Sequence, residues 1–89
     1  MIDPAASVFN FPCAFPIKAV GYSSTDFQAI VVSIIRRHAP DLDERAVTSR
    51  LSGQGRYLAI SATFTAHSRE QLDALYVELS GHEQVLWVL

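Results

Sequence analysis

Residues 56–66 read RYLAISATFTA, and large apolar residues alternate there with small or polar ones over more positions than in any other segment. Successive side chains of a strand point to opposite faces. One side of the predicted strand is apolar: Leu58, Ile60, Ala62 and Phe64. The other side is uncharged and rich in hydroxyls: Tyr57, Ala59, Ser61, Thr63 and Thr65. The alternation predicts a central strand with one buried face, so the main functional question is what covers the other face.

Two amphipathic helices flank this strand in the sequence. Residues 25–38 and 68–81 both repeat apolar side chains every three or four positions, which gives each helix one buried stripe. Each segment begins on a hydroxyl residue with a glutamine three positions later. This is the spacing of a capping box, in which the two side chains satisfy free amides of the first turn. The pairs are Thr25 with Gln28 and Ser68 with Gln71.

Three further segments have the pattern of strands: residues 15–21, 46–51 and 85–89. The resulting order of strand, helix, strand, strand, helix, strand is that of the ferredoxin-like fold. We therefore predict an α+β sandwich of βαββαβ topology. Its four-stranded antiparallel sheet has the first and third strands in the centre and both helices on one face. In this prediction residues 1–13 form an irregular N-terminal arm and residues 14–89 form the ferredoxin-like domain.

The size and charge of the chain argue against several classes of function. Its 89 residues suit one domain, and a net charge of −2 with seven scattered Lys and Arg residues gives no footprint for nucleic acid. The single cysteine, Cys13, allows no intramolecular disulfide, which suits a reducing cytoplasm. No apolar run approaches the roughly 20 residues that span a bilayer. We predict a cytoplasmic protein that uses no metal, no cofactor and no membrane partner.

The sheet face without helices is the predicted binding surface. Its candidate ligand- or partner-binding residues are Lys18, Arg50, Tyr57, Ser61 and Thr63. The alternation also suggests that Leu86 and Val88 lie on this face. Lys18 has a simpler explanation as a lysine that guards an exposed sheet against aggregation, and Tyr57 can equally shield the glycine-containing turn beside it. The predicted partner is another protein or a second copy of the chain, and a small-molecule ligand is a further candidate.

No residue is predicted to be catalytic or to bind a metal. Nucleophilic catalysis by Cys13 would need a positioned base and oxyanion donors, and the sequence identifies neither. His67 and His82 flank the second helix at opposite ends, so the two are not expected to share a metal ion. The loop after the first strand contains neither the arginine of an acylphosphatase-like site nor the paired cysteines of a metal chaperone.

Several short motifs are spread over residues 11–89. They are Phe11-Pro12 followed by Phe15, Lys18 and Gly21; Arg37-His38-Ala39-Pro40; Gly55 and Tyr57 in the hairpin; Gln71 to Leu79 with Leu75-Tyr76 and Glu78-Leu79; and Val88-Leu89. Together they resemble the YbeD-like family of small bacterial proteins of unknown function. The resemblance implies a fold similar to the ACT regulatory domains, which bind small metabolites or pair with each other. It also implies a regulator linked to lipoate, and it supplies no catalytic motif.

The function predicted from these observations is a small non-enzymatic regulatory or protein-interaction module. A metabolite bound in the manner of ACT-like domains is compatible with it. The alternative is a small enzyme of unknown reaction. An enzyme should bring titratable groups together in a cleft, whereas an interaction module should present an open surface without such a cluster.

Overall fold

The computed structural model describes residues 10–24 and 26–89. Its elements are β1 (Cys13–Tyr22), α2 (Phe27–His38), the 3-10 turn η1 (Glu44–Ala46), β2 (Val47–Ser52), β3 (Tyr57–Ala66), α3 (Arg69–Gly81) and β4 (Val85–Val88). The strands form one sheet in the order β2-β3-β1-β4, and all neighbours are antiparallel. The predicted βαββαβ fold is confirmed, with the first and third strands in the centre. Residues 1–9, which make up most of the predicted arm, lie outside the described residues.

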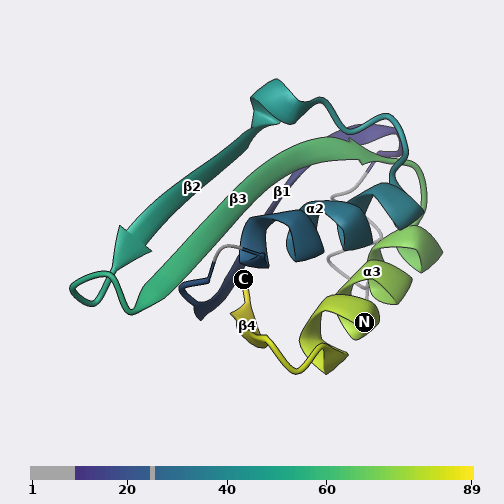
Figure 1. Cartoon of the computed structure of the whole chain (residues 1–89). Helices are drawn as coiled ribbons and strands as arrows, with labels where there is room; N and C mark the ends of the chain where they lie inside the picture. Colours follow the sequence, from purple (N-terminus) through teal and green to yellow (C-terminus); the bar gives the residue numbers. More distant parts are fainter. Residues whose placement is uncertain (1–9, 25) are drawn as a thin grey trace, which may run out of the picture.

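Both helices cover the same face of the sheet (Figure 1). The inward residues of β3 are Ile60, Ala62, Phe64 and Ala66, and all are buried. They join one hydrophobic core with the buried stripes of α2 and α3, which include the fully buried Ile34 and Leu75. The alternation in residues 56–66 therefore predicted correctly which face of β3 is buried.

The two helices are tied together at the start of α3. The Ser68 hydroxyl accepts a hydrogen bond from the Gln71 backbone amide at 3.0 Å, as predicted. The Gln71 side-chain oxygen accepts from the backbone amide of His67 at 2.6 Å, one residue before the cap. Its side-chain nitrogen donates to the His38 carbonyl at 2.7 Å, at the end of α2. One glutamine thus satisfies free backbone groups of both helices.

Among the described residues, the start of α2 has no side-chain cap like that of α3, and its end is held by an ion pair. The helix begins at Phe27 after Asp26, and Thr25 of the predicted capping box lies outside the described residues. At the other end, Glu78 of α3 pairs with Arg37 and accepts from His38 Nε2 at 2.7 Å.

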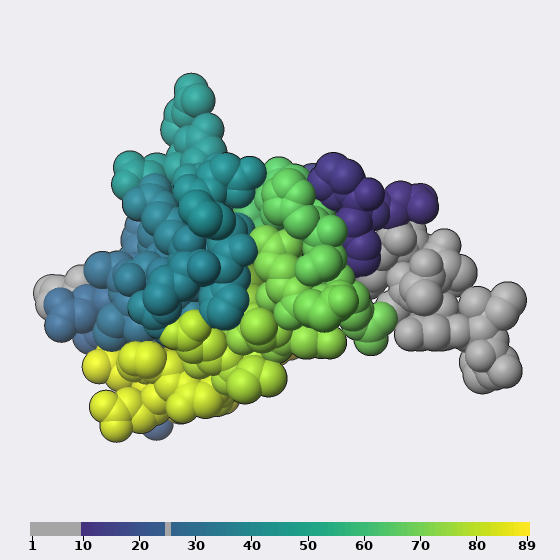
Figure 2. Space-filling view, turned by 90° about the vertical axis from the view of Figure 1, so that its right-hand side faces the viewer, coloured from purple at the N-terminus to yellow at the C-terminus, as the bar shows by residue number. Residues whose placement is uncertain are grey.

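In the space-filling view, the surface of α2 (blue to teal) abuts that of α3 (green to yellow), and the segment around η1 (teal) projects at the top (Figure 2).

The short strand β4 is not aligned as the sequence pattern suggested. Its register against β1 shifts between Val20 and Gly21, so that Val88 lies opposite Ala19 and Trp87 lies opposite Val20. Val88 consequently packs against the core, and its predicted position on the other face is wrong. Trp87 faces away from the helices instead. A register shift of this kind depends on pairing with a neighbouring strand. The alternation of residues within one strand therefore does not predict it.

Candidate functional site

The face of the sheet opposite the helices, hereafter the open face, is built from cross-strand rows. One row joins Thr48, Ser61 and Lys18; the next joins Arg50, Ala59, Val20 and Trp87; the third joins Ser52, Tyr57 and Tyr22. Thr63, two residues beyond Ser61 on β3, lies opposite Pro16. All five residues predicted to bind a ligand or partner therefore share this one face.

Three of the predicted residues surround one hollow on the open face. Lys18, Ser61 and Thr63 line it together with Thr48 and Arg45, and its volume is about 620 Å³. Hydroxyl groups and cationic side chains therefore border the same depression. Such groups can accept or donate hydrogen bonds and can attract a carboxylate or phosphate oxygen.

The other two predicted residues lie outside this hollow. Tyr57 belongs to a group of aromatic side chains at the end of the sheet where β2 and β3 form their hairpin. Its ring stacks on Tyr22 with centroids 5.6 Å apart and lies 6.5 Å from the tilted ring of Trp87. We call Tyr22, Tyr57 and Trp87 the aromatic platform. Arg50 lies in the adjacent row, opposite Ala59.

The aromatic platform is exposed, although a residue of its neighbouring row is not. Tyr22 is 62% exposed and Trp87 is 48% exposed. Val20, which points to the open face beside Trp87, is only 5% exposed and does not belong to the core beneath the helices. Neighbouring side chains of the open face therefore already cover an apolar residue, and they leave the rings accessible from outside.

Sequence reasoning identified Tyr57 but missed Tyr22 and Trp87. Tyr22 is one residue beyond the predicted first strand, which in the structure extends to Cys13–Tyr22. Trp87 sits in an uninterrupted apolar run whose face cannot be read from alternation. One feature of the sequence could have pointed to Trp87 as a binding residue: it is the only tryptophan of the chain and lies in the last predicted strand.

Charged residues are distributed unevenly between the strands and the rest of the chain. The four strands contain no Asp or Glu, and their only charged residues are Lys18 and Arg50. Four of the five arginines outside the strands have acidic neighbours: Arg36 pairs with Glu44, Arg37 with Glu78, Arg45 with Asp43 and Arg69 with Asp73. Within the described part of the chain, no carboxylate pairs with Lys18 or Arg50. The positive charge of the open face is therefore not neutralised by neighbouring side chains.

Arg45, at the border of the hollow, has an acidic partner, whereas none of the described residues provides one for Lys18. Its guanidinium and backbone amide donate to the Asp43 carboxylate, at 3.1 Å from Nη2 and 2.9 Å from the backbone nitrogen. These hydrogen bonds lower the pKa of Asp43 below its ordinary value, because they stabilise the ionised carboxylate. Asp43 thus pairs with Arg45, whereas Lys18 on the same hollow has no ion-pair partner among the described residues.

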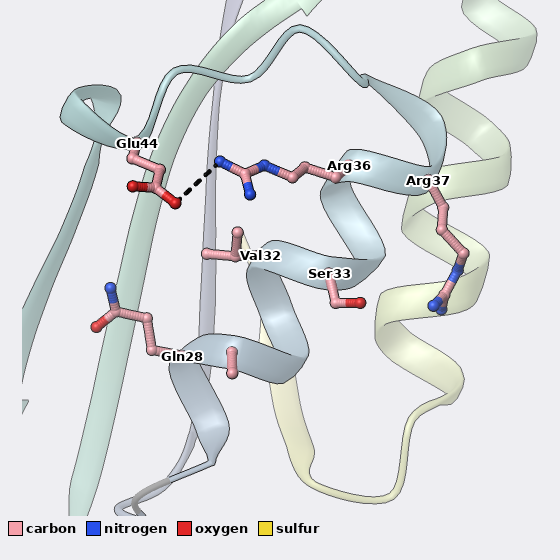
Figure 3. A pocket seen from close by; sticks show the side chains of 7 residues that line it. Gln28, Val32, Ser33, Arg36, Arg37 and Glu44 are labelled. Atoms are coloured by element: carbon pink, nitrogen blue, oxygen red, sulfur yellow. Dashed lines mark ion pairs between the residues drawn. The ribbon is translucent and has the colours of Figure 1, made fainter.

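A second hollow, of about 960 Å³, lies on the outer surface of α2 (Figure 3). Its polar side chains do not converge: Arg36 reaches Glu44 across 3.3 Å, while Arg37 extends toward α3 on the opposite side. Across residues 10–24 and 26–89, no three His, Cys, Asp or Glu side chains gather to hold a metal ion. Neither described helix is long and apolar enough to cross a membrane.

Comparison with known sequences links the chain to one family. A family model described as "Protein of unknown function (DUF493)" matches residues 6–89. A "UPF0250 protein" of Chromobacterium violaceum is 44% identical over 89 residues, covering 100% of both chains. A "UPF0250 protein" of Leptothrix cholodnii is 46% identical over 83 residues, which are 93% of this chain and 91% of that relative.

Two solved structures share the architecture. The ACT domain from GTP pyrophosphokinase of Chlorobium tepidum superimposes with a TM-score of 0.67 at 14% identity, over 86% of this chain and 83% of that domain. A protein from H. pylori gives a TM-score of 0.70 at 8% identity, over 100% of this chain and 97% of that protein. At these identities the likeness shows the fold, which is ferredoxin-like and ACT-like.

Proposed function

This chain belongs to the family described as "Protein of unknown function (DUF493)", in agreement with its resemblance to YbeD-like proteins, and we propose that it is a non-enzymatic regulatory module that binds a protein partner. The open face is the proposed binding surface. Lys18, Arg50, Tyr57, Ser61 and Thr63 are its predicted contact residues, and Tyr22 and Trp87 extend it. The single cysteine of the chain suits the cytoplasm as the place of action.

The aromatic platform is the observation that carries the proposal. Tryptophan and tyrosine dominate the binding energy of protein interfaces, because they bury a large area and lose few rotamers. Three such rings lie together on the open face, and two of them are about half exposed or more. Monomeric proteins seldom leave grouped apolar surface uncovered without a use for it.

The strands carry no Asp, Glu or His, so the open face offers no catalytic base beside its hydroxyl groups, which favours binding over catalysis. The titratable groups that do gather, Arg37, His38 and Glu78, join the two helices instead. A hydrolytic or transfer enzyme needs a nucleophile and a base within hydrogen-bond reach of each other. Lys18, Ser61 and Thr63 provide hydroxyls and a cation but no base beside them. Cys13 lies at the far end of β1, opposite Ala66. The open face therefore fits recognition better than bond making.

A small-molecule ligand is a second candidate because of the hollow around Lys18. A metabolite with a carboxylate or phosphate could place its anionic group between this lysine and the hydroxyls of Ser61 and Thr63. Regulation by such a metabolite would match what the ACT-like resemblance implies, and the same resemblance suggests a regulator linked to lipoate.

The test is Thr63→Glu, which puts a charge on the open face at the border of the hollow. We expect the variant to fold as the wild type does by circular dichroism and to lose partners in pull-down and sedimentation experiments. Val77→Glu is the matched control, because Val77 is 71% exposed on α3 and lies away from the open face. If Thr63→Glu folds normally and keeps every partner of the wild type, the open face is not the functional surface.

A further inference from the structure

The acidic residues of the chain are kept away from the sheet. The described ones lie on helices, on η1 or in connections: Asp26, Asp41, Asp43, Glu44, Glu70, Asp73, Glu78 and Glu83. The open face thus carries a positive charge in a protein whose net charge is −2. Lys18 in a central strand and Arg50 in the edge strand β2 spread that charge over the face.

This distribution of charge opposes pairing of the open face with itself. In an interface formed by two identical surfaces, residue i of one copy contacts residue j of the other, and the reverse contact occurs as well. Lys18 and Arg50 would then meet no Asp or Glu side chain of the strands, because none lies there. Like charges facing each other across an interface suppress association. A second copy docked through the same face is therefore disfavoured.

The shape of the open face further limits which kind of molecule can bind to it. The aromatic platform is not part of the hollow around Lys18, and small molecules usually need a concave site that buries most of their surface. Exposed aromatic rings beside separate cations are instead typical of protein interfaces, where buried aromatic anchors are surrounded by polar contacts. A polypeptide can cover both the aromatic platform and the hollow at once.

We propose that the partner of the open face is an acidic polypeptide segment with an apolar anchor residue, rather than a second copy of this chain. The anchor packs on Tyr22, Tyr57 and Trp87, and carboxylates of the segment pair with Lys18 and Arg50. The inference rests on the proposed function, since it specifies the chemistry of the partner that the open face binds.

The experiment uses the full chain and three short synthetic peptides without tryptophan. The first has one phenylalanine flanked by glutamates, the second replaces every glutamate with lysine, and the third replaces the phenylalanine with alanine. Because Trp87 is the only tryptophan, its fluorescence reports contact with the platform. Amide chemical shifts of labelled protein show which strands respond. Sedimentation in the same buffers measures self-association.

We expect the glutamate peptide to shift Trp87 emission and the amides of the open face, with an affinity that falls about tenfold as salt rises from about 50 to 300 mM. The lysine peptide should not bind, and loss of the phenylalanine should weaken binding about tenfold. Lys18→Glu should lower the affinity about tenfold, with Lys18→Gln in between. Arg69→Glu makes the same change of charge at the start of α3 and should leave the affinity within about twofold.

Three results would overturn the inference: no response to the glutamate peptide, equal affinity for the lysine peptide, or equal effects of Lys18→Glu and Arg69→Glu. A wild-type dimer that Thr63→Glu dissociates would also overturn it, yet would leave the open face as the functional surface. Retention of every cellular partner by Thr63→Glu would instead reject the proposed function itself. The experiments therefore distinguish a wrong assignment of the partner's chemistry from a wrong assignment of the open face as the functional surface.

Discussion

The two faces of this sheet are made by the same strands and differ in almost every physical property. Toward the helices, β1 and β3 present apolar residues that are nearly all inaccessible, among them Ile17, Ile60 and Phe64. Toward the other side, the same strands present Lys18, Ser61 and hydroxyl or aromatic neighbours. The covered face therefore stabilises the fold. The open face contributes little that the core requires, so its residues are free to serve recognition.

The contrast is sharpest at adjacent positions. Phe64 is 4% exposed and its ring lies 5.9 Å from that of Phe15, while Thr63 beside it is exposed and borders the hollow. Substitutions at such neighbours should separate stability from binding.

Phe64→Ala should have the largest effect on the free energy of unfolding. Removing a buried aromatic side chain loses its transfer free energy and leaves a cavity, which together cost about 3–5 kcal/mol. Thr63→Ala is the control on the other face, and it should change the stability by no more than about 0.5 kcal/mol. Denaturant titration measures both. Similar losses for the two variants would show that the open face also belongs to the structural core.

Gly21→Ala should have the second largest effect. Gly21 lies where β1 and β4 shift register, and an added Cβ would collide with the Gln84 carbonyl oxygen and with the Phe27 ring. Overpacking of this kind costs about 1–3 kcal/mol. Gly81→Ala is the matched control, because its Cβ would meet nothing within 4 Å. If thermal unfolding finds the two variants equally stable, the close approach of Gln84 and Phe27 to Gly21 is not needed.

Ser68→Ala should destabilise the helical layer by about 1 kcal/mol, the usual effect of removing an N-cap hydroxyl. The hydroxyl accepts from the Gln71 amide at 3.0 Å, and its loss also loosens the link from Gln71 to α2. Binding to the open face should not change. A loss of affinity in the peptide titration without a loss of stability would contradict the separation of the two faces.

Asp43→Asn should have the smallest effect, and an effect that depends on pH. The folded-state pKa of Asp43 lies below the ordinary value of 3.8, so its contribution is present above that value and is lost as the pH falls through the folded pKa. The wild type should therefore exceed the variant in stability at neutral pH and lose this small advantage in acid. The variant also frees Arg45 beside Lys18, so it should bind the glutamate peptide more tightly at neutral pH. A pH-independent difference would show that the Asp43–Arg45 contact does not act through charge.

Much of this architecture could be predicted from local patterns. A period of two in residues 56–66 sorted Ile60 and Phe64 from Ser61 and Thr63, because the geometry of a strand alternates its side chains regardless of context. The spacing of Ser68 and Gln71 located the start of α3, because a capping hydroxyl acts within one turn. The order of the elements then limited the topology to one common fold.

The set of elements and the buried side of each central strand can be read from local patterns, since both follow from interactions between residues close in the chain. The tertiary structure brought Tyr22, Tyr57 and Trp87 together, because the register shift between β1 and β4 turned Trp87 toward the open face. It also decided which cations have acidic partners: Arg37 meets Glu78 across the helix pair, while Lys18 and Arg50 meet no carboxylate among the described residues. Pairing of this kind joins residues far apart in sequence, and its energy depends on distances that exist only after the chain has folded.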